Sequence, residues 1–150
     1  DHVEYIDNWD TWGKDTVAYG TTDISFSPSM IVGSTLTFTL FRSEYKEDKK
    51  QQLTVSLISK YVSKQYLDNT SDDSRSIDPY FVNDVRLNYS LEHIGLRNIS
   101  FIALVRNVFD VDYVSNGWVY KYQSGDQTNK LDGLFPQAGI NYMLGVNLAF

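Results

Sequence analysis

Apolar and polar residues alternate along most of this chain with a period of two, which is the pattern of β-strands. The clearest case is the ending, residues 142–150, where every second residue is apolar and the others are small or less apolar. The two sets point to opposite faces of a strand. Because terminal segments of soluble domains are usually polar and frayed, this ending predicts a strand that is buried or lies against lipid. Its apolar set is Tyr142, Leu144, Val146, Leu148 and Phe150.

The same alternation predicts six strands in all, and no segment shows a helical period. They cover residues 1–9, 24–41, 53–67, 81–91, 99–109 and about 137–150. In the second segment the even positions stay apolar except Ser34, which favours one long strand. A hairpin turning around Pro28 is the alternative, since proline usually interrupts a strand.

The predicted connections are of two kinds. Those near residues 10–22, 67–79 and 122–136 are long, while 42–51 and 92–98 are short. Transmembrane barrels have short periplasmic turns and longer extracellular loops. If Phe150 lies at the periplasmic end, the alternating direction of the strands places every long loop outside the cell.

Composition narrows the classes of protein that fit. The 150 residues suit one domain, and 15% of them are aromatic, which favours strands. No apolar run approaches the roughly 18 residues of a membrane helix, so a helical membrane protein is excluded. The net charge of -6 argues against nucleic acid as a partner, and the absence of cysteine excludes disulfides and thiol chemistry. The first residues show no signal peptide and begin as though inside a strand, which predicts a fragment of a longer chain.

Alternation alone also fits a soluble β-sandwich or a closed soluble barrel. Three features favour a membrane barrel instead: strands longer than usual, polar groups such as Asp84, Arg86 and Asn88 on the less apolar face, and aromatic residues at strand borders. Six strands cannot close such a barrel, for which eight is about the minimum. We therefore expect further sequence, a partner chain or oligomerisation to complete it.

Four segments carry a resemblance to a known family. They are KYVSKQYLDNT (60–70), DPYFVNDVRLNY (78–89), NVFDVDY (107–113), and the ending from FPQAG (135–139) to Phe150. In order and spacing these segments resemble the C-terminal barrel strands of TonB-dependent outer-membrane receptors, along essentially the whole chain. The ending is more similar to stand-alone receptors for siderophores or cobalamin than to the glycan-importing subclass.

The resemblance implies the last six strands of a 22-stranded barrel in the bacterial outer membrane, with the plug domain and earlier strands absent from this chain. It implies no enzyme and no cofactor, but active import of a scarce nutrient such as an iron–siderophore or cobalamin. The implied partners are the rest of the barrel and plug, the TonB complex, outer-membrane lipid, the barrel-assembly machinery and a surface lipoprotein. The terminal set of Tyr142, Leu144, Val146, Leu148 and Phe150 matches the signal that the assembly machinery reads.

Other chemistry has weaker support. Catalysis would have to use His2 or His93, and a Ser-His-Asp hydrolase is the enzymatic alternative. One acidic loop could be either a solvated loop or a calcium site, although the spacing of its acidic residues lacks the EF-hand pattern. The acidic residues of that loop are Asp68, Asp72, Asp73 and Asp78.

Aromatic residues in the predicted outer loops could stack on a ligand, although a belt at the membrane surface needs the same residues. The candidates are Trp12, Trp118, Tyr120 and Tyr122, with Trp9 beside them. Two functional alternatives to the importer stay open: a soluble β-sheet binding module, and a barrel that anchors another domain.

Overall fold

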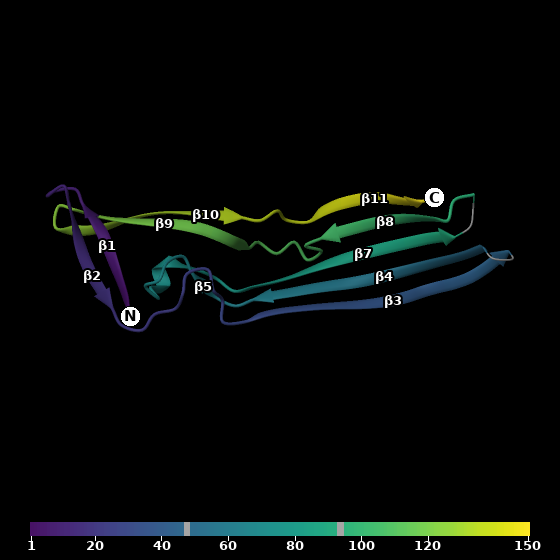
Figure 1. Cartoon of the computed structure of the whole chain (residues 1–150), viewed down its shortest axis with the longest axis horizontal. Helices are drawn as coiled ribbons and strands as arrows, with labels where there is room; N and C mark the ends of the chain where they lie inside the picture. The colour runs from purple at the N-terminus through teal and green to yellow at the C-terminus, as the bar shows by residue number, and fades with distance from the viewer. Residues whose placement is uncertain (47–48, 93–94) are drawn as a thin grey trace. The chain divides into compact units, whose positions relative to one another are not determined.

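The computed structural model describes residues 1–46, 49–92 and 95–150 (Figure 1). These residues form eleven strands and one short 3-10 helix, so the prediction of an all-β fold is confirmed. The chain divides into two compact units. Unit 1 comprises Asp1–Ile31, Val62–Tyr80 and Tyr113–Gln137, and unit 2 comprises Val32–Tyr61, Phe81–Asp112 and Ala138–Phe150. In the described part of the chain no sheet closes into a barrel.

Unit 2 is built on a five-stranded sheet in the order β11-β8-β7-β4-β3. Its strands follow one another along the chain as a meander, with neighbouring arrows in opposite directions (Figure 1). The C-terminus consequently lies at the same end of this sheet as the last residue of β7 and the first residue of β8. The strands are β3 (Ile31–Lys46), β4 (Lys49–Val62), β7 (Tyr80–Glu92), β8 (Asn98–Arg106) and β11 (Asn141–Ala149).

Unit 1 contains a four-stranded sheet in the order β10-β9-β1-β2. Its two hairpins are joined by a short parallel pairing of Asp7 with Tyr122 and Asn8 with Gln123, a local exception to the antiparallel prediction. Unit 1 also holds the short pair β5 (Gln65–Tyr66) and β6 (Ser76–Ile77) and the 3-10 helix η1 (Asp73–Arg75). The four long strands are β1 (His2–Asn8), β2 (Gly13–Tyr19), β9 (Val114–Ser124) and β10 (Gln127–Pro136).

The prediction of six strands was wrong because two predicted loops are strands. The segment 10–22 contains β2, which pairs with β1 from end to end. The segment 122–136 contains the end of β9 and all of β10, joined by Gly125 and Asp126. Both turn residues have positive φ, 61° and 57°, as a type I′ hairpin turn requires. The many polar residues around this turn concealed the strands, because an exposed hairpin does not need an apolar face.

The strand predicted from residue 24 begins only at Ile31. Residues before it turn instead: Phe26 has a φ of 53°, and the Ser27 amide donates to the Ile24 carbonyl at 3.3 Å. Pro28 then follows, which cannot donate to a ladder. The alternating pattern was right for β3 but not for the residues that lead into it.

Two further boundaries were wrong. The charged connection predicted over 42–51 belongs largely to β3 and β4, where Lys50 and Glu44 pair at 3.7 Å; Glu47 and Asp48 lie outside the described residues. Charge does not interrupt a strand whose side chains reach water. At the other end of the sheet, β8 stops at Arg106 rather than at residue 109, because Asn107 has a φ of 51°.

The two units differ in how they bury apolar side chains. The buried apolar residues of the described chain are Ile6, Val62, Leu67 and Ile77, and all four belong to unit 1. Apart from Val62 at the end of β4, the five-stranded sheet therefore has no buried apolar residue among the described ones. Within those residues, no helix is long and apolar enough to cross a membrane.

Candidate functional site

One face of the unit 2 sheet is apolar across three adjacent strands. The backbone register of β7, β8 and β11 aligns their apolar residues in rows, because paired residues share a face. We call this surface the apolar face. Its four rows are Val85–Val105–Tyr142, Leu87–Ala103–Leu144, Tyr89–Phe101–Val146 and Leu91–Ile99–Leu148.

The opposite face of the same strands is mixed. Charged and amide side chains are interspersed there with apolar ones, and β11 contributes small residues to this face. Its rows are Arg86–Leu104–Met143, Asn88–Ile102–Gly145, Ser90–Ser100–Asn147 and Glu92–Asn98–Ala149. The sheet of unit 2 therefore has one face suited to an apolar medium and one that tolerates water.

The apolar face continues onto β4 and β3. Leu53 of β4 lines one hollow together with Leu87 and Phe101. Ser56 lies three residues after Leu53 in β4, so its side chain is on the opposite face, the mixed face. Its hydroxyl is hydrogen-bonded to the Thr37 hydroxyl of β3 at 2.9 Å, so Thr37 lies on the mixed face too. The residues that alternate with Thr37 belong to the apolar face, and they include Leu36 and Phe38, which are 54% and 59% exposed.

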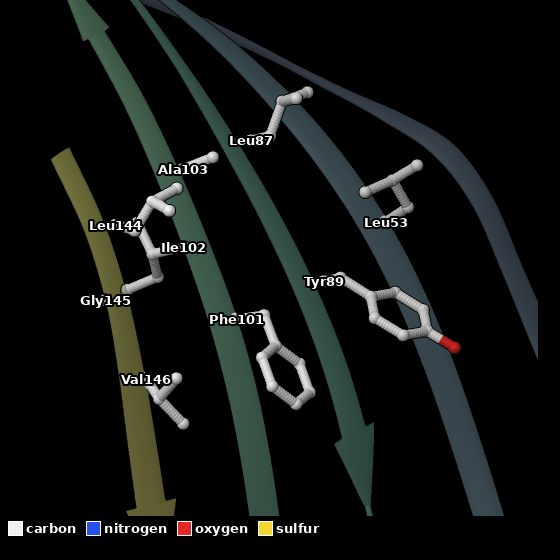
Figure 2. Close-up of a pocket in the computed structure, with 9 residues that line it drawn as sticks. All are labelled: Leu53, Leu87, Tyr89, Phe101, Ile102, Ala103, Leu144, Gly145 and Val146. Atoms are coloured by element: carbon white, nitrogen blue, oxygen red, sulfur yellow. The ribbon is translucent and has the colours of Figure 1, made fainter. Parts of the chain in front are cut away.

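The apolar face carries a shallow hollow of about 510 Å³ (Figure 2). It is centred on the small residue Ala103, whose partners Leu87 and Leu144 stand on either side. Tyr89 and Phe101 bound the hollow in the next row. No charged side chain lines it. The hollow could take an apolar group, and it offers no chemistry for catalysis.

The residues predicted as an assembly signal lie on or next to β11 and are all exposed. Their exposed fractions are 72% for Tyr142, 84% for Leu144, 57% for Val146, 53% for Leu148 and 90% for Phe150. Among the described residues, β11 is also an edge strand, with β8 as its one neighbour in the sheet. The strand thus presents both an apolar face and a free backbone edge.

Three of the four predicted ligand-facing aromatics come together with Trp9 in unit 1. Trp118, Tyr120 and Tyr122 alternate along β9 and share one face of its sheet. Trp9 stacks on Tyr122 with ring centroids 3.9 Å apart and planes at 16°, and Tyr122 stacks on Tyr120 at 6.1 Å. Trp118 lies over Gly133 of β10, where a side chain larger than hydrogen would collide with the indole. We call these four rings, with Asp7, the aromatic surface.

Trp12 lies apart from this set, at the turn between β1 and β2. It is 93% exposed and has a φ of 54°, a conformation that few residues other than glycine adopt. The Asn8 side chain holds the turn, because its Oδ1 accepts the amides of Asp10 and Thr11 at 3.0 and 3.1 Å.

A carboxylate lies beside the rings of the aromatic surface. The Tyr120 hydroxyl donates to Asp7 Oδ2 at 2.8 Å, and this bond to a carboxylate raises the pKa of Tyr120. Lys14 lies 3.9 Å from the other carboxylate oxygen. Asp7 stays 43% exposed, so the surface combines flat rings with an accessible hydrogen-bond acceptor.

The most buried polar group of unit 1 is Arg75, which is 1% exposed. Its guanidinium donates to Glu4 at 3.1 Å, to Asp72 at 3.3 Å and to Asp68. Sequence reasoning missed this cluster, because the run 68–76 reads as a solvated loop. One arginine among several acids was the available signal, since a buried guanidinium needs carboxylate partners.

Glu4 is held ionised by the same cluster. Partial burial would raise its pKa, but the hydrogen bond from Tyr19 at 2.8 Å and the charges of Lys121 and Arg75 outweigh that effect. The pKa of Glu4 therefore lies below its usual value. The pKa of Asp72 is also lowered, chiefly by its hydrogen bonds with Ser74.

In the NVFDVDY segment, Asn107 and Asp110 link the end of β8 to the start of β11 through hydrogen bonds. Asn107 is 4% exposed; its Nδ2 donates to the carbonyls of Val111 and Ala138 at 2.9 and 3.3 Å, and its Oδ1 accepts the Val111 amide. Asp110 Oδ1 accepts the Ile140 amide at 2.7 Å. These contacts give the motif a structural task in unit 2, because they bind backbone groups of Ala138 and Ile140 just before β11.

The residues considered for other chemistry have ordinary partners. His2 stacks on Tyr19 at 5.9 Å, and His93 lies outside the described residues. In the predicted acidic loop, Asp68 and Asp72 bind Arg75, and Asp73 binds Lys64. In the described ranges, no group of three or more His, Cys, Asp or Glu side chains could hold a metal ion.

Comparison of the chain with protein-family models, curated proteins and solved structures finds no match.

Proposed function

We propose that unit 2 is part of the wall of an outer-membrane barrel of the TonB-dependent receptor type, and that the whole receptor imports a scarce nutrient. The observation that carries the proposal is the apolar face, where three adjacent strands align twelve residues of which none is charged. In water such a surface is unfavourable by about 25 cal/mol for each Å² left uncovered. Lipid would cover it without any partner of fixed shape.

The mixed face supports the same proposal. A barrel wall alternates lipid-facing apolar residues with lumen-facing polar ones, and Arg86, Asn88 and Glu92 lie opposite the apolar rows. The meander order and the two free edges, β3 and β11, also fit a piece of an up-and-down barrel. In the complete receptor, further strands would pair with both edges, since unpaired backbone in lipid costs several kcal/mol for each group.

Membrane extraction tests this proposal. We expect the chain, expressed with the outer-membrane targeting and the remaining strands that a receptor requires, to stay with the membrane through carbonate and high-salt washes and to leave only with detergent. Release by either wash would contradict the proposal and would favour a soluble binding module whose apolar face has a protein partner.

The reading frame before Asp1 gives an independent test of the import function. It should encode a plug domain, a TonB-contacting segment and the earlier strands of the barrel. A frame that encodes another kind of domain would leave the membrane location intact and would favour the anchor alternative. Loss of iron–siderophore or cobalamin uptake on deletion of the gene would then identify the nutrient.

A further inference from the structure

The aromatic surface of unit 1 has features that its role in the fold does not require. Trp9 and Trp118 are 51% and 47% exposed, and Tyr120 is 37% exposed. An apolar core needs its rings covered, but these rings are open to solvent. Exposed apolar surface that is ordered and grouped is typical of binding sites.

The rings are fixed before any ligand arrives. Trp9 is held by its stack on Tyr122, and its amide donates to the Gln123 carbonyl at 2.9 Å. The Tyr120 ring is held at both ends, by the ring of Tyr122 and by the bond from its hydroxyl to Asp7. Binding would therefore cost little side-chain entropy, which is the advantage of rigid aromatic residues in recognition.

Charge narrows the class of ligand. Asp7 contributes a carboxylate within a chain of net charge -6, so an anionic ligand such as a phosphate or a carboxylate is disfavoured. A purely apolar ligand is disfavoured as well, because it would strip water from Asp7 without replacing its hydrogen bonds. The surface suits a neutral ligand that has a flat apolar face and hydroxyl donors at its edge.

We propose that the aromatic surface binds a neutral saccharide. A pyranose ring has a flat face of C–H groups that can stack on the indole of Trp9, and hydroxyl groups around its rim. Asp7 accepts one hydrogen bond from Tyr120 on Oδ2, and an ionised carboxylate has about four acceptor sites. The remaining sites can accept from sugar hydroxyls. This inference does not rest on the proposed import function, since the surface belongs to unit 1 and needs no membrane.

Tryptophan fluorescence gives the test, because all three tryptophans of the chain belong to unit 1. We would substitute Trp12→Phe, so that only the two tryptophans of the aromatic surface, Trp9 and Trp118, report, and titrate the full chain with maltohexaose and cellohexaose. A second titration uses lipopolysaccharide with a neutral O-chain, which presents the same chemistry on a lipid. We expect saturable quenching in at least one titration; free oligosaccharide would indicate a soluble ligand, and lipopolysaccharide alone a surface glycolipid.

Two matched variants then test the site itself. Asp7→Asn should weaken the binding by about tenfold, the effect of one charge-assisted hydrogen bond. Asp132→Asn is the control, because Asp132 is also 43% exposed and paired with a lysine, but its partner in the register is Val119, of the opposite phase to Trp118 and Tyr120. Absence of quenching in every titration, or equal weakening by both variants, would overturn the proposal.

Discussion

Arg75 Nη1 donates to Glu4 Oε1 at 3.1 Å, although 71 positions separate the two residues in the sequence. The bond joins β1 to the connection between β4 and β7. Glu4 also accepts hydrogen bonds from Tyr19 and Lys121. Four segments of unit 1, namely β1, β2, β9 and the connection between β4 and β7, thus meet around Glu4 and Arg75. The energetics of unit 1 should depend on this cluster more than on any other polar contact described above.

Replacing Arg75 with methionine should destabilise unit 1 by about 3 kcal/mol, because the loss of the buried cation leaves acidic groups facing one another. Urea unfolding followed by tryptophan fluorescence measures the change, since every tryptophan lies in unit 1. Lys64→Met is the control: Lys64 pairs with Asp73, but the two side chains are 38% and 78% exposed. That variant should change the free energy of unfolding far less than Arg75→Met does, because solvent screens an exposed ion pair. Equal effects of the two substitutions would show that the Arg75 cluster does not contribute more to the stability of unit 1 than an exposed ion pair does.

Acid should weaken unit 1 through Glu4 and Asp72. Their pKa values in the folded chain are lowered from ordinary values of 4.5 and 3.8. A lowered carboxyl pKa adds stability that is fully present above the unfolded pKa and is lost as the pH falls through the folded pKa. We therefore expect the free energy of unfolding to be flat above about pH 5.5 and to fall below about pH 4.5.

Glu4→Gln isolates the part of this acid dependence that Glu4 contributes. The variant should be less stable than the parent at neutral pH and should lose less stability between neutral pH and pH 3. Urea titrations at a series of pH values give both curves. Parallel curves for the two proteins would show that Glu4 is not a source of the acid dependence.

The strands of unit 2 could be predicted from the sequence because each has a face that must stay apolar. β7 and β11 carry that alternation over most of their length, so their existence and phase followed from it. The hairpins of unit 1 could not be predicted in the same way. β2 and β10 each begin with a run of polar residues, and a strand without a continuous apolar face leaves no periodic signal.

The candidate functional residues also divide into those that follow from alternation and those that depend on contacts in the fold. The apolar set of β11 followed directly from alternation, and the stack of Trp9 on Tyr122 could be suspected only from composition. The Arg75 cluster was out of reach because it depends on contacts between residues far apart in the chain. Asn107 and Asp110 were recognised as part of a motif, but only the fold shows which backbone groups they bind.

Gly139→Ala should destabilise unit 2 through Asp110. A Cβ atom at residue 139 would lie 2.5 Å from Asp110 Oδ1, so the carboxylate would have to move and release the Ile140 amide. We expect a loss of about 1–3 kcal/mol, the cost of a displaced hydrogen bond at a crowded site. In an Asp110→Ala background the same glycine substitution should cost clearly less, because the colliding atom is gone. Denaturant titration of the four proteins of this cycle gives the coupling energy, and strictly additive effects would contradict the contact.

Arginine at Leu144 should impair membrane integration, while arginine at the neighbouring Met143 should not. Both side chains are well exposed in the chain, at 84% and 56%, so a soluble protein would tolerate either change. The two residues differ in the face they occupy: Leu144 is in a row with Leu87 and Ala103, and Met143 is in a row with Arg86 and Leu104. An arginine on the lipid face near the bilayer centre costs about 2–4 kcal/mol, and one on the lumen face much less. The amount of heat-modifiable folded barrel retained in carbonate-washed membranes measures the effect for each variant. Equal retention of the two arginine variants would mean that lipid does not cover the apolar face, and the proposed membrane location would then be wrong.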